Sequence, residues 1–397
     1  IARPFGGALF GHLGDRIGRK STLVATLLLM GISTLIIGFL PGYNTLGILA
    51  PLLLVLLRFG QGLGVGGEWG GSVLLALEYG HRRNRGFWAS WPQMGVALGL
   101  VLSTIAVNIF QSPGKDFFNS IGWRIPFFIS ALLILIGLYI RVRILETPLF
   151  AKILEEKQVA KSPIAEAFRH HTPEIVLSAG ARFVEQAPFY LFTVFVITYG
   201  KHLKLPDALV LNGITIAAII ELGTIPLFGY LSDRVGRRKW YLIGCGVMLL
   251  FAFPYFLLLN TQNWFLVGLG IVLSLALCHA WVYGPQAALI AERFGTRSRY
   301  SGASLGYQLA APFAGGLAPI IALLLLSGKS TLSALGLPKV EVSIGSGSWQ
   351  SVSIYIVVLA LISFLSVLGL QELTHADISG DMTKTTTPEA TPVGLQE

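Results

Sequence analysis

Charged residues are scarce in this chain: Asp, Glu, Lys and Arg make up 12% of its 397 residues, about half the share of an ordinary soluble domain. Hydrophobic residues make up 53%. This balance excludes an ordinary soluble protein and an intrinsically disordered one, because lipid has to solvate most of such a surface. We therefore predict an integral membrane protein whose surroundings are the lipid bilayer.

Further absences exclude other classes of function. The two cysteines, Cys245 and Cys278, both lie in apolar runs, so we expect no disulfide framework. No phosphate-binding P-loop is present, which argues against ATP as the energy source. Six of the seven histidines fall in predicted loops or tails, so we expect neither an enzyme nor a bound metal or cofactor. No soluble output domain accompanies the apolar runs, which disfavours a membrane sensor.

Apolar runs nearly free of charge recur along the chain, and several reach about 20 residues, the length that crosses a bilayer core as a helix. A closed β-barrel would need alternating polarity along shorter strands, and these runs show none. The sequence therefore predicts an all-α membrane protein. The predicted helices are 1–10, 22–40, 47–79, 86–111, 122–143, 173–200, 207–229, 240–259, 264–291, 301–327 and 350–371.

Basic residues gather in alternate connections between these helices. They are dense at 16–20, 82–85, 141–169, 234–239 and 293–299 and sparse in the connections between. By the positive-inside rule, the dense set is predicted to be cytoplasmic. The net charge of +9 thus indicates topology, and no nucleic-acid partner is expected.

An internal repeat divides the chain, because GHLGDRIGRKSTL at 11–23 returns as GYLSDRVGRRKW at 229–240. Such a repeat between apolar runs predicts a two-halved transporter. Gly11 and Gly18 would let the chain turn sharply between two helix ends. The second half has room for two helices before its copy and the first half for part of one, so symmetry predicts that one further helix, the first of twelve, precedes Ile1. The predicted segments are a first half at 1–143, a cytoplasmic linker at 144–172, a second half at 173–371 and a disordered cytoplasmic tail at 372–397.

Each copy of the repeat supplies charges for a latch. Asp15 can accept hydrogen bonds from the N-terminus of a neighbouring helix, and Arg19 can reach a carboxylate. Glu78 and Glu292 stand in a second pair of repeated segments, EYGHRRNRG and ERFGTRSRYSG, and are the expected carboxylates. The alternative is that the basic loops only fix orientation. The predicted gating residues are Asp15, Arg19, Glu78, Asp233, Arg237 and Glu292.

Ionisable residues inside the predicted helices point to a binding site, because each costs about 2.5–3.5 kcal/mol at the bilayer centre and usually faces a cavity. Arg58 has no acidic residue one turn away and is the first choice for holding a substrate carboxylate by two hydrogen bonds. Arg3 is the next choice. Arg182 and Glu185, spaced i,i+3, could form a structural ion pair or contact the substrate.

Proton coupling needs a buried group whose protonation responds to a nearby anion. Glu68 and Glu185 rank above Glu221 as proton carriers, although each could instead make only a structural bond between helices. His279 is the sole histidine in a membrane segment and could relay a proton, donate to substrate or simply be packed. Other side chains that could line a central cavity, or only pack, are Trp69, Trp91, Gln93, Trp281, Tyr283, Gln286 and Gln308.

Glycines in the same helices match a nucleotide-binding pattern without predicting such a site. Gly62, Gly64 and Gly67 fit GxGxxG, but that fingerprint needs a preceding strand, and here it lies inside a membrane helix. Glycine pairs four residues apart instead predict faces on which helices approach closely. These pairs are Gly66 and Gly70, Gly67 and Gly71, Gly95 and Gly99, and Gly302 and Gly306.

Several motifs together resemble one family. GHLGDRIGRKSTL resembles the loop signature of the major facilitator superfamily, and RFGQGLGVGGEWGG at 58–71 resembles its fourth-helix signature. GWRIPF at 122–127, RSRYSGASLGYQ at 297–308 and SWQSVSIY at 348–355 narrow the resemblance to the metabolite:proton symporter family. The pattern is most similar to that family's shikimate-transporter branch.

The resemblance implies two pseudo-symmetric six-helix halves and proton-coupled symport of a small organic acid across the plasma membrane by a monomer. Members of the family carry shikimate, oxoglutarate, citrate, and proline or betaine. The resemblance also implies that Asp15, Arg19 and Glu78, with their counterparts in the second half, lock the inward face shut in the outward-open state. Uniport, antiport and symport of a zwitterion such as proline or betaine stay open as alternatives.

Overall fold

The computed structural model describes residues 1–143, 146–147, 151, 155, 162–327, 330–331, 341–342 and 347–376. Its first part contains α1 (Ala2–Ile17), α2 (Arg19–Phe39), α3 (Tyr43–Leu46), α4 (Leu49–Tyr79), η1 (Arg82–Asn84), α5 (Arg85–Gln111), α6 (Lys115–Ser120), η2 (Gly122–Arg124) and α7 (Ile125–Arg143). Its second part contains α9 (Pro163–Ala181), α10 (Phe183–Tyr190), η3 (Leu191–Phe195), α11 (Val196–His202), α12 (Asp207–Val235), α13 (Arg237–Asn260), α14 (Trp264–Val272), η4 (Leu273–His279), α15 (Ala280–Ala291), α16 (Arg299–Gln308), η5 (Ala311–Gly316), α17 (Ala318–Ser327) and α18 (Trp349–Leu368). Two short strands, β1 (Ser330–Thr331) and β2 (Glu341–Val342), pair antiparallel.

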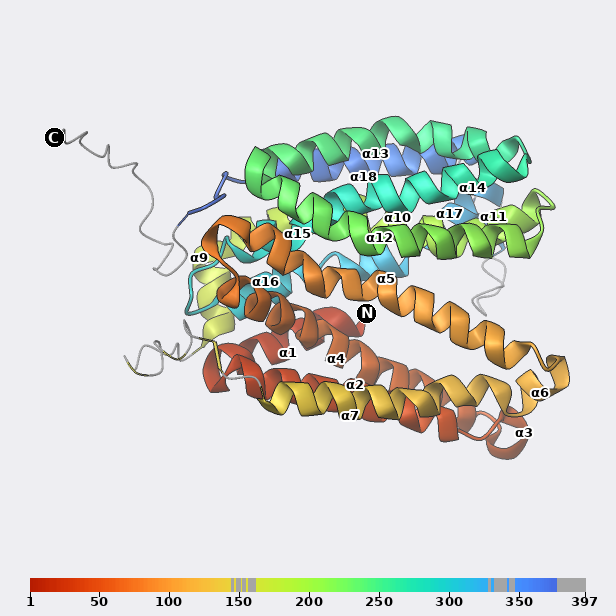
Figure 1. Cartoon of the computed structure of the whole chain (residues 1–397), viewed down its shortest axis with the longest axis horizontal. Helices are drawn as coiled ribbons and strands as arrows, with labels where there is room; N and C mark the ends of the chain where they lie inside the picture. Colours follow the sequence, from red (N-terminus) through yellow and green to blue (C-terminus); the bar gives the residue numbers. More distant parts are fainter. Residues whose placement is uncertain are drawn as a thin grey trace.

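The helices form two bundles that lie side by side, α1 to α7 in one and α9 to α18 in the other (Figure 1). Within the described residues, nine helices are long and apolar enough to cross a membrane. The bundles meet through α1 against α16 and through α5 against α12 and α15. We call the end of the molecule that carries both copies of the repeat the motif end; it lies on the left of Figure 1, with α9.

The repeat does not turn where the sequence suggests. The predicted helix 1–10 continues as α1 through Gly11 to Ile17, so the prediction of a turn at Gly11 is wrong. Gly11 instead allows a close helix contact, because a Cβ there would lie 2.9 Å from Ser301 Cα. The chain turns at Gly18, with φ 113°, and at the matching Gly236, with φ 103°, a region that favours glycine.

Most other predicted helices are present with shifted ends. Three helices of the second half contain a π-helical turn, η3, η4 or η5, a feature often found at functional sites. The polar linker ends in helix, since α9 begins at Pro163 and bends at His171. The rest of the linker lies largely outside the described residues, as does the predicted disordered tail beyond Ala376.

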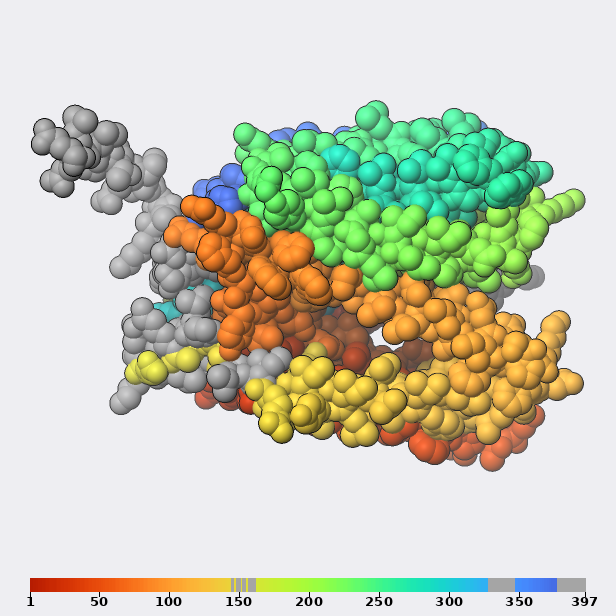
Figure 2. Space-filling view, in the orientation of Figure 1, coloured from red at the N-terminus to blue at the C-terminus, as the bar shows by residue number. Residues whose placement is uncertain are grey.

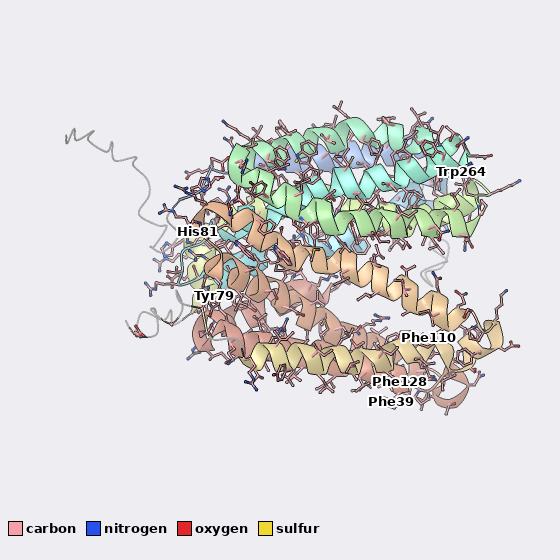
Figure 3. The ribbon with its side chains drawn as sticks, in the orientation of Figure 1. Phe39, Tyr79, His81, Phe110, Phe128 and Trp264 are labelled. Atoms are coloured by element: carbon pink, nitrogen blue, oxygen red, sulfur yellow. The ribbon has the colours of Figure 1, made fainter. Side chains whose placement is uncertain are left out.

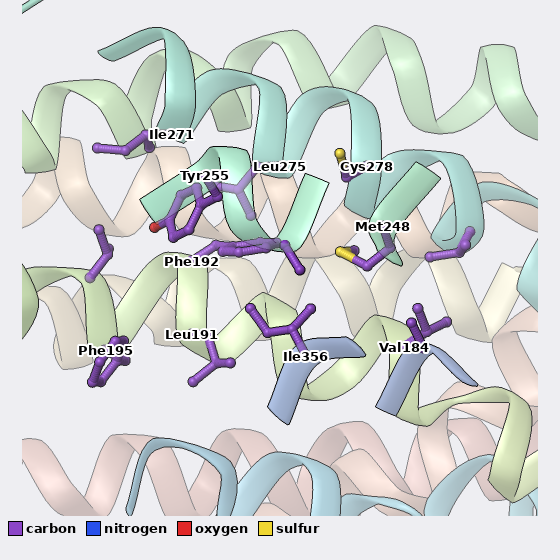
Figure 4. Close-up of a cluster of buried hydrophobic side chains, with 14 of the residues drawn as sticks. Val184, Leu191, Phe192, Phe195, Met248, Tyr255, Ile271, Leu275, Cys278 and Ile356 are labelled. Atoms are coloured by element: carbon purple, nitrogen blue, oxygen red, sulfur yellow. The ribbon is translucent and has the colours of Figure 1, made fainter. Parts of the chain in front are cut away.

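The two halves differ in how they bury side chains. The second half contains a continuous apolar core, in which Phe192, Met248, Tyr255 and Ile356 pack together (Figure 4). In the first half, no residue of α7 is buried. A pocket of about 740 Å³ lies among α2, α4, α5 and α7, and Figure 2 shows the hollow between α5 and α7.

Aromatic side chains stand near both ends of the helices (Figure 3). Tyr79 and His81 lie at the motif end, while Trp264 and the contacting pair Phe39 and Phe128 lie at the opposite end. Trp264 is 72% exposed. Tyrosine and tryptophan at these depths are typical of the interface between lipid and water.

Close packing of glycines is confirmed for most of the predicted pairs. Gly66 lies against the backbone of Arg3, and Gly67 lies against Phe10. Gly302 lies against Phe294 in the same way. The prediction is wrong for Gly95 and Gly99, where a Cβ would meet nothing within 4 Å, because this face of α5 borders open space.

A matched pair of glycine substitutions tests this packing. Gly284→Ala should lower the melting temperature of the purified protein by several degrees, because a Cβ there would collide with the Ile225 carbonyl and Gly229 nitrogen of α12 and overpacking costs about 1–3 kcal/mol. Gly246→Ala, in α13 with nothing within 4 Å, should leave it unchanged or slightly raised. Equal melting temperatures for the two variants would contradict the packing.

Candidate functional site

Two acidic side chains at the motif end join the halves by capping helices. Asp15, in the last turn of α1, accepts hydrogen bonds from the backbone nitrogens of Tyr300 (3.1 Å) and Ser301 (2.8 Å). These nitrogens belong to the first turn of α16, whose N–H groups lack helical partners and carry a partial positive charge. The expected contact between Asp15 and a helix N-terminus is therefore present, and the helix belongs to the opposite half.

The second copy repeats this contact in the other direction. Asp233, near the end of α12, accepts from the backbone nitrogens of Gly86 (2.8 Å) and Phe87 (2.9 Å) in the first turn of α5. Asp15 and Asp233 are 2% and 3% exposed. Each half thus uses one buried carboxylate to hold the N-terminus of a helix in the other half.

Buried ion pairs stand beside both caps. Arg19 pairs with Glu78, as predicted. Arg237 pairs with Glu292, with its Nε 2.5 Å and its Nη2 2.7 Å from the carboxylate oxygens. Arg237 Nη1 also lies 2.7 Å from Asp233 Oδ1. The arginines therefore tie the turn of each repeat to the end of a helix in the same half.

One further ion pair crosses between the halves. Arg299 Nη1, at the start of α16, lies 3.2 Å from Glu78 Oε1 in α4, and both side chains are fully buried. Sequence reasoning missed Arg299, although the repeated segments that contain Glu78 and Glu292 both place an arginine seven residues after the glutamate. Nearby, burial lowers the pKa of Arg293 to about 10, which leaves it charged at neutral pH.

An open cavity of about 900 Å³, which we call the central cavity, lies between the halves, and Arg58 in its lining is exposed. Its lining includes Arg3 and Arg58 and no acidic residue among the described side chains. Arg58 Nη1 donates to Gln61 Oε1 at 3.1 Å, and Gln61 Nε2 donates to Thr34 Oγ1 at 2.6 Å. The contacts recorded for Arg58 are therefore neutral, and the cavity carries positive charge. The main polar residues of its lining are Arg3, Thr34, Arg58 and Gln61 from the first half and Gln186 and Tyr190 from the second.

A chain of buried charges runs through the second half. His279 Nδ1, at the end of η4, lies 2.6 Å from Glu221 Oε1 in α12, and its Nε2 lies 3.6 Å from Glu185 Oε1 in α10. Glu185 Oε2 accepts from Arg182 Nε at 3.2 Å, so the ion pair predicted from their spacing is present. We call Arg182, Glu185, Glu221 and His279 the buried charge cluster. The cluster contains one arginine and two carboxylates, so with a neutral histidine its net charge is negative. One additional proton makes it neutral, the state that a low dielectric favours.

Known proteins resemble this chain in sequence and in fold. The family profile described as Major Facilitator Superfamily matches residues 1–319. The chain belongs to this superfamily. It is a multi-pass membrane protein and a metabolite transporter of this superfamily, not an enzyme.

Three relatives show the extent of the similarity. The Inner membrane metabolite transport protein YhjE of Escherichia coli K12 is 42% identical over 345 residues, which cover 85% of this chain and 78% of the relative. The Shikimate transporter of the same strain is 37% identical over 381 residues, covering 95% and 83%. The Proline/betaine transporter of Salmonella typhimurium LT2 is 30% identical over 394 residues, covering 96% and 74%.

Solved structures confirm the facilitator fold. The proton:xylose symporter XylE, solved bound to 6-bromo-6-deoxy-D-glucose, matches with a TM-score of 0.71 over 96% of this chain and 86% of that chain. Its sequence identity is 18%. At this identity the likeness shows the fold alone.

Four further candidate residues of this transporter, Glu68, Gln93, Gln286 and Gln308, do not line the central cavity. Glu68 pairs with Arg141 of α7, a partner that sequence reasoning missed, and lines the separate pocket of the first half. Gln93 donates to the Tyr283 carbonyl at 3.4 Å, and Gln308 donates to the Gly66 carbonyl at 3.2 Å. These two bonds cross between the halves. Gln286, by contrast, donates to the Tyr241 hydroxyl within the second half at 2.8 Å. A substrate-binding role for Gln93, Gln286 and Gln308 stays a prediction.

The helix caps can be tested by a label distance. Spin labels at Ser21→Cys and Lys239→Cys would occupy equivalent exposed positions in the first turns of α2 and α13. Asp15→Asn should move part of the population to longer label distances, because a charged acceptor for two buried N–H groups is lost. A loss of about 1–2 kcal/mol corresponds to a shift of about 5- to 30-fold in the population ratio.

The control for this experiment is Asp207→Asn. Asp207 is exposed, and its ion pair with Lys201 is long at 3.9 Å. It should leave the distance distribution unchanged. An unchanged distribution in Asp15→Asn as well would mean that the cap does not hold the halves together.

Proposed function

We propose that the protein is a proton-coupled symporter that carries a small organic acid across the plasma membrane by alternating access, acting as a monomer. The observation that carries this proposal is the charge of the central cavity, whose described lining has two arginines and no acid. Both halves of one chain line this cavity, which supports a monomeric transport unit. The similarity to metabolite transporters supports the same class of activity.

Orientation follows from the basic residues. The motif end carries the arginine-rich turns at 16–20, 82–85 and 234–239, so the positive-inside rule places this end, the linker and the tail in the cytoplasm. The caps and ion pairs at this end then close the inward face. In this proposal the structure represents an outward-facing state, and Asp15 and Asp233 with their arginine partners form the gate that must open.

Substrate recognition is assigned to the arginines of the cavity. A planar guanidinium matches a carboxylate by two parallel hydrogen bonds, and Arg58 makes its recorded bond to a neutral amide, which a carboxylate can displace. Arg3 adds a second positive charge. A simple organic acid fits this lining better than a zwitterion, because the ammonium of a zwitterion has no acidic partner among the described lining residues.

Proton uptake is assigned to the buried charge cluster. His279 Nδ1 is bonded to Glu221 at 2.6 Å and its Nε2 lies 3.6 Å from Glu185, so a proton has only short distances to cover between the three groups. Glu68 is a weaker candidate, since it pairs with Arg141 on a different pocket. The geometry therefore favours Glu185, Glu221 and His279 as the proton-carrying groups.

The anion site predicts a specific response to a conservative change. Arg58→Lys should raise the KM for uptake of radiolabelled shikimate by about tenfold or more, because an ammonium cannot offer the two-donor fork. Initial rates would be measured in proteoliposomes with an imposed pH gradient, using Arg143→Lys at the motif end as the control. An unchanged KM in Arg58→Lys would remove Arg58 from the site. Stronger competition by betaine than by citrate or oxoglutarate would favour the zwitterion alternative.

The proton site predicts a separation of exchange from accumulation. Glu221→Gln mimics the protonated acid, so counterflow of labelled shikimate should persist while accumulation driven by a pH gradient is lost. The partly exposed pair Glu166 and Arg297, 3.9 Å apart, provides the control Glu166→Gln, which should accumulate shikimate normally. Uptake by the unmodified protein that survives an uncoupler unchanged would contradict symport and leave a uniporter or an antiporter.

A further inference from the structure

One aromatic stack connects the two halves beside the buried charge cluster. The rings of Trp69 in α4 and Tyr307 in α16 lie with centroids 3.5 Å apart and planes 11° from parallel. The guanidinium carbon of Arg182 lies 3.2 Å from the centroid of the same Tyr307 ring. Two groups this close cannot share one face of a ring, so Tyr307 is held between the indole of one half and the guanidinium of the other.

The stack lies next to the central cavity, on its motif side. Val65, Ala311 and Gln186 line the cavity. Trp69, Tyr307 and Arg182 each lie four residues from one of these positions, toward the motif end of their helices. Four residues are about one helical turn, or about 6 Å. All three residues therefore lie about one turn from the cavity lining in the direction of the motif end, and Trp69 also lines the pocket of the first half.

Both sides of the stack are fixed by further bonds. Trp69 Nε1 donates to Gln93 Oε1 at 2.8 Å, which sets the plane of the indole. Arg182 donates to the Tyr307 carbonyl and, through Nε, to Glu185 Oε2 at 3.2 Å. Tyr307 is 4% exposed and Arg182 is 2% exposed. Two contacts thus hold the guanidinium over the ring, one to the Tyr307 carbonyl and one to the charged carboxylate of Glu185.

We propose that the Trp69–Tyr307 stack is an inner gate of the transport path and that Arg182 links this gate to the protonation of the buried charge cluster. The inference rests on the proposed proton-coupled function and assigns how the proton acts. When the proton that enters the cluster comes to rest on Glu185, its carboxylate becomes the neutral acid and its ion pair with Arg182 ends, while Arg182 keeps its own charge. Arg182 then keeps its bond to the Tyr307 carbonyl but loses the carboxylate that fixes its second side, so the guanidinium can leave the face of the ring and the stack loosens.

The surroundings of Glu185 include the groups that could share its proton. The titratable or charged neighbours are Arg182, Glu221, Tyr241, His279, Tyr283 and Tyr307. Arg182 is the member of this set that contacts both the Glu185 carboxylate and the stacked ring. It is therefore the positioning residue through which a change in the cluster reaches the other half.

The label pair at Ser21→Cys and Lys239→Cys reports the gate without any solute. Distances would be recorded in lipid nanodiscs between about pH 8 and pH 5, the range in which histidine clusters commonly titrate. In the parent, acidification should raise the ratio of open to closed populations by about fivefold or more. Tyr307→Phe keeps the ring and should keep this response. Tyr307→Leu removes the ring and should reduce the response to below about twofold.

Two further variants test whether a lost pH response is due to the Trp69–Tyr307 stack or to the loss of any aromatic packing. Trp69→Leu removes the same stack from the opposite half and covers the case in which Tyr307→Leu does not fold. Trp240→Leu removes an aromatic stack within the second half, where Trp240 and Trp281 lie 4.8 Å apart at 16°, and should retain the pH response of the parent.

The outcomes distinguish the two proposals. A pH-dependent parent whose Tyr307→Leu and Trp69→Leu variants respond equally would overturn the inner gate and leave proton coupling intact. A parent whose distances ignore pH would overturn proton coupling through this cluster and, with it, the inference. Loss of the response in Tyr307→Leu and Trp69→Leu, with retention in Tyr307→Phe and Trp240→Leu, supports the gate.

Discussion

The structure depends on a carboxylate of one half that caps a helix of the other. Asp15 takes the first free N–H groups of α16, and Asp233 takes those of α5. Free N–H groups at a helix start must find partners when they are buried, and an ionised acceptor satisfies them best. These contacts bring the motif end of both bundles together, and the cavity between the halves lies on the far side of this junction.

The same constraint explains the arginines. A carboxylate that is buried without a partner costs several kcal/mol, on the order of the total stability that one domain has available. Glu78 is shared by Arg19 and Arg299, and Arg237 is shared by Asp233 and Glu292. The proposed gate is therefore a network in which the loss of one member leaves another charge buried without a partner. Such a network is either complete or broken, which suits a switch between two states.

The two halves divide the chemistry unequally. The second half contains the apolar core, the three π-helical turns and the buried charge cluster. The first half contributes Arg3 and Arg58 to the cavity. The packed core of the second half can hold the buried charge cluster at fixed distances. Arg3 and Arg58 need only a cavity through which an anion can reach them. Tyr307 lies where these two parts meet.

The sequence by itself determined the class of protein, most of the helices apart from their ends, and the repeat. It also determined ion pairs whose members are marked by the repeat or by local spacing, such as Arg19 with Glu78 and Arg182 with Glu185. These features depend on local composition and on periodicity, which a linear chain displays directly. Only the tertiary structure decided that Asp15 caps a helix of the opposite half and that His279 joins Glu221. It also decided that Tyr307 lies between Trp69 and Arg182. The reason is physical: such contacts depend on how helices far apart in the chain pack against one another, and no local spacing records that packing.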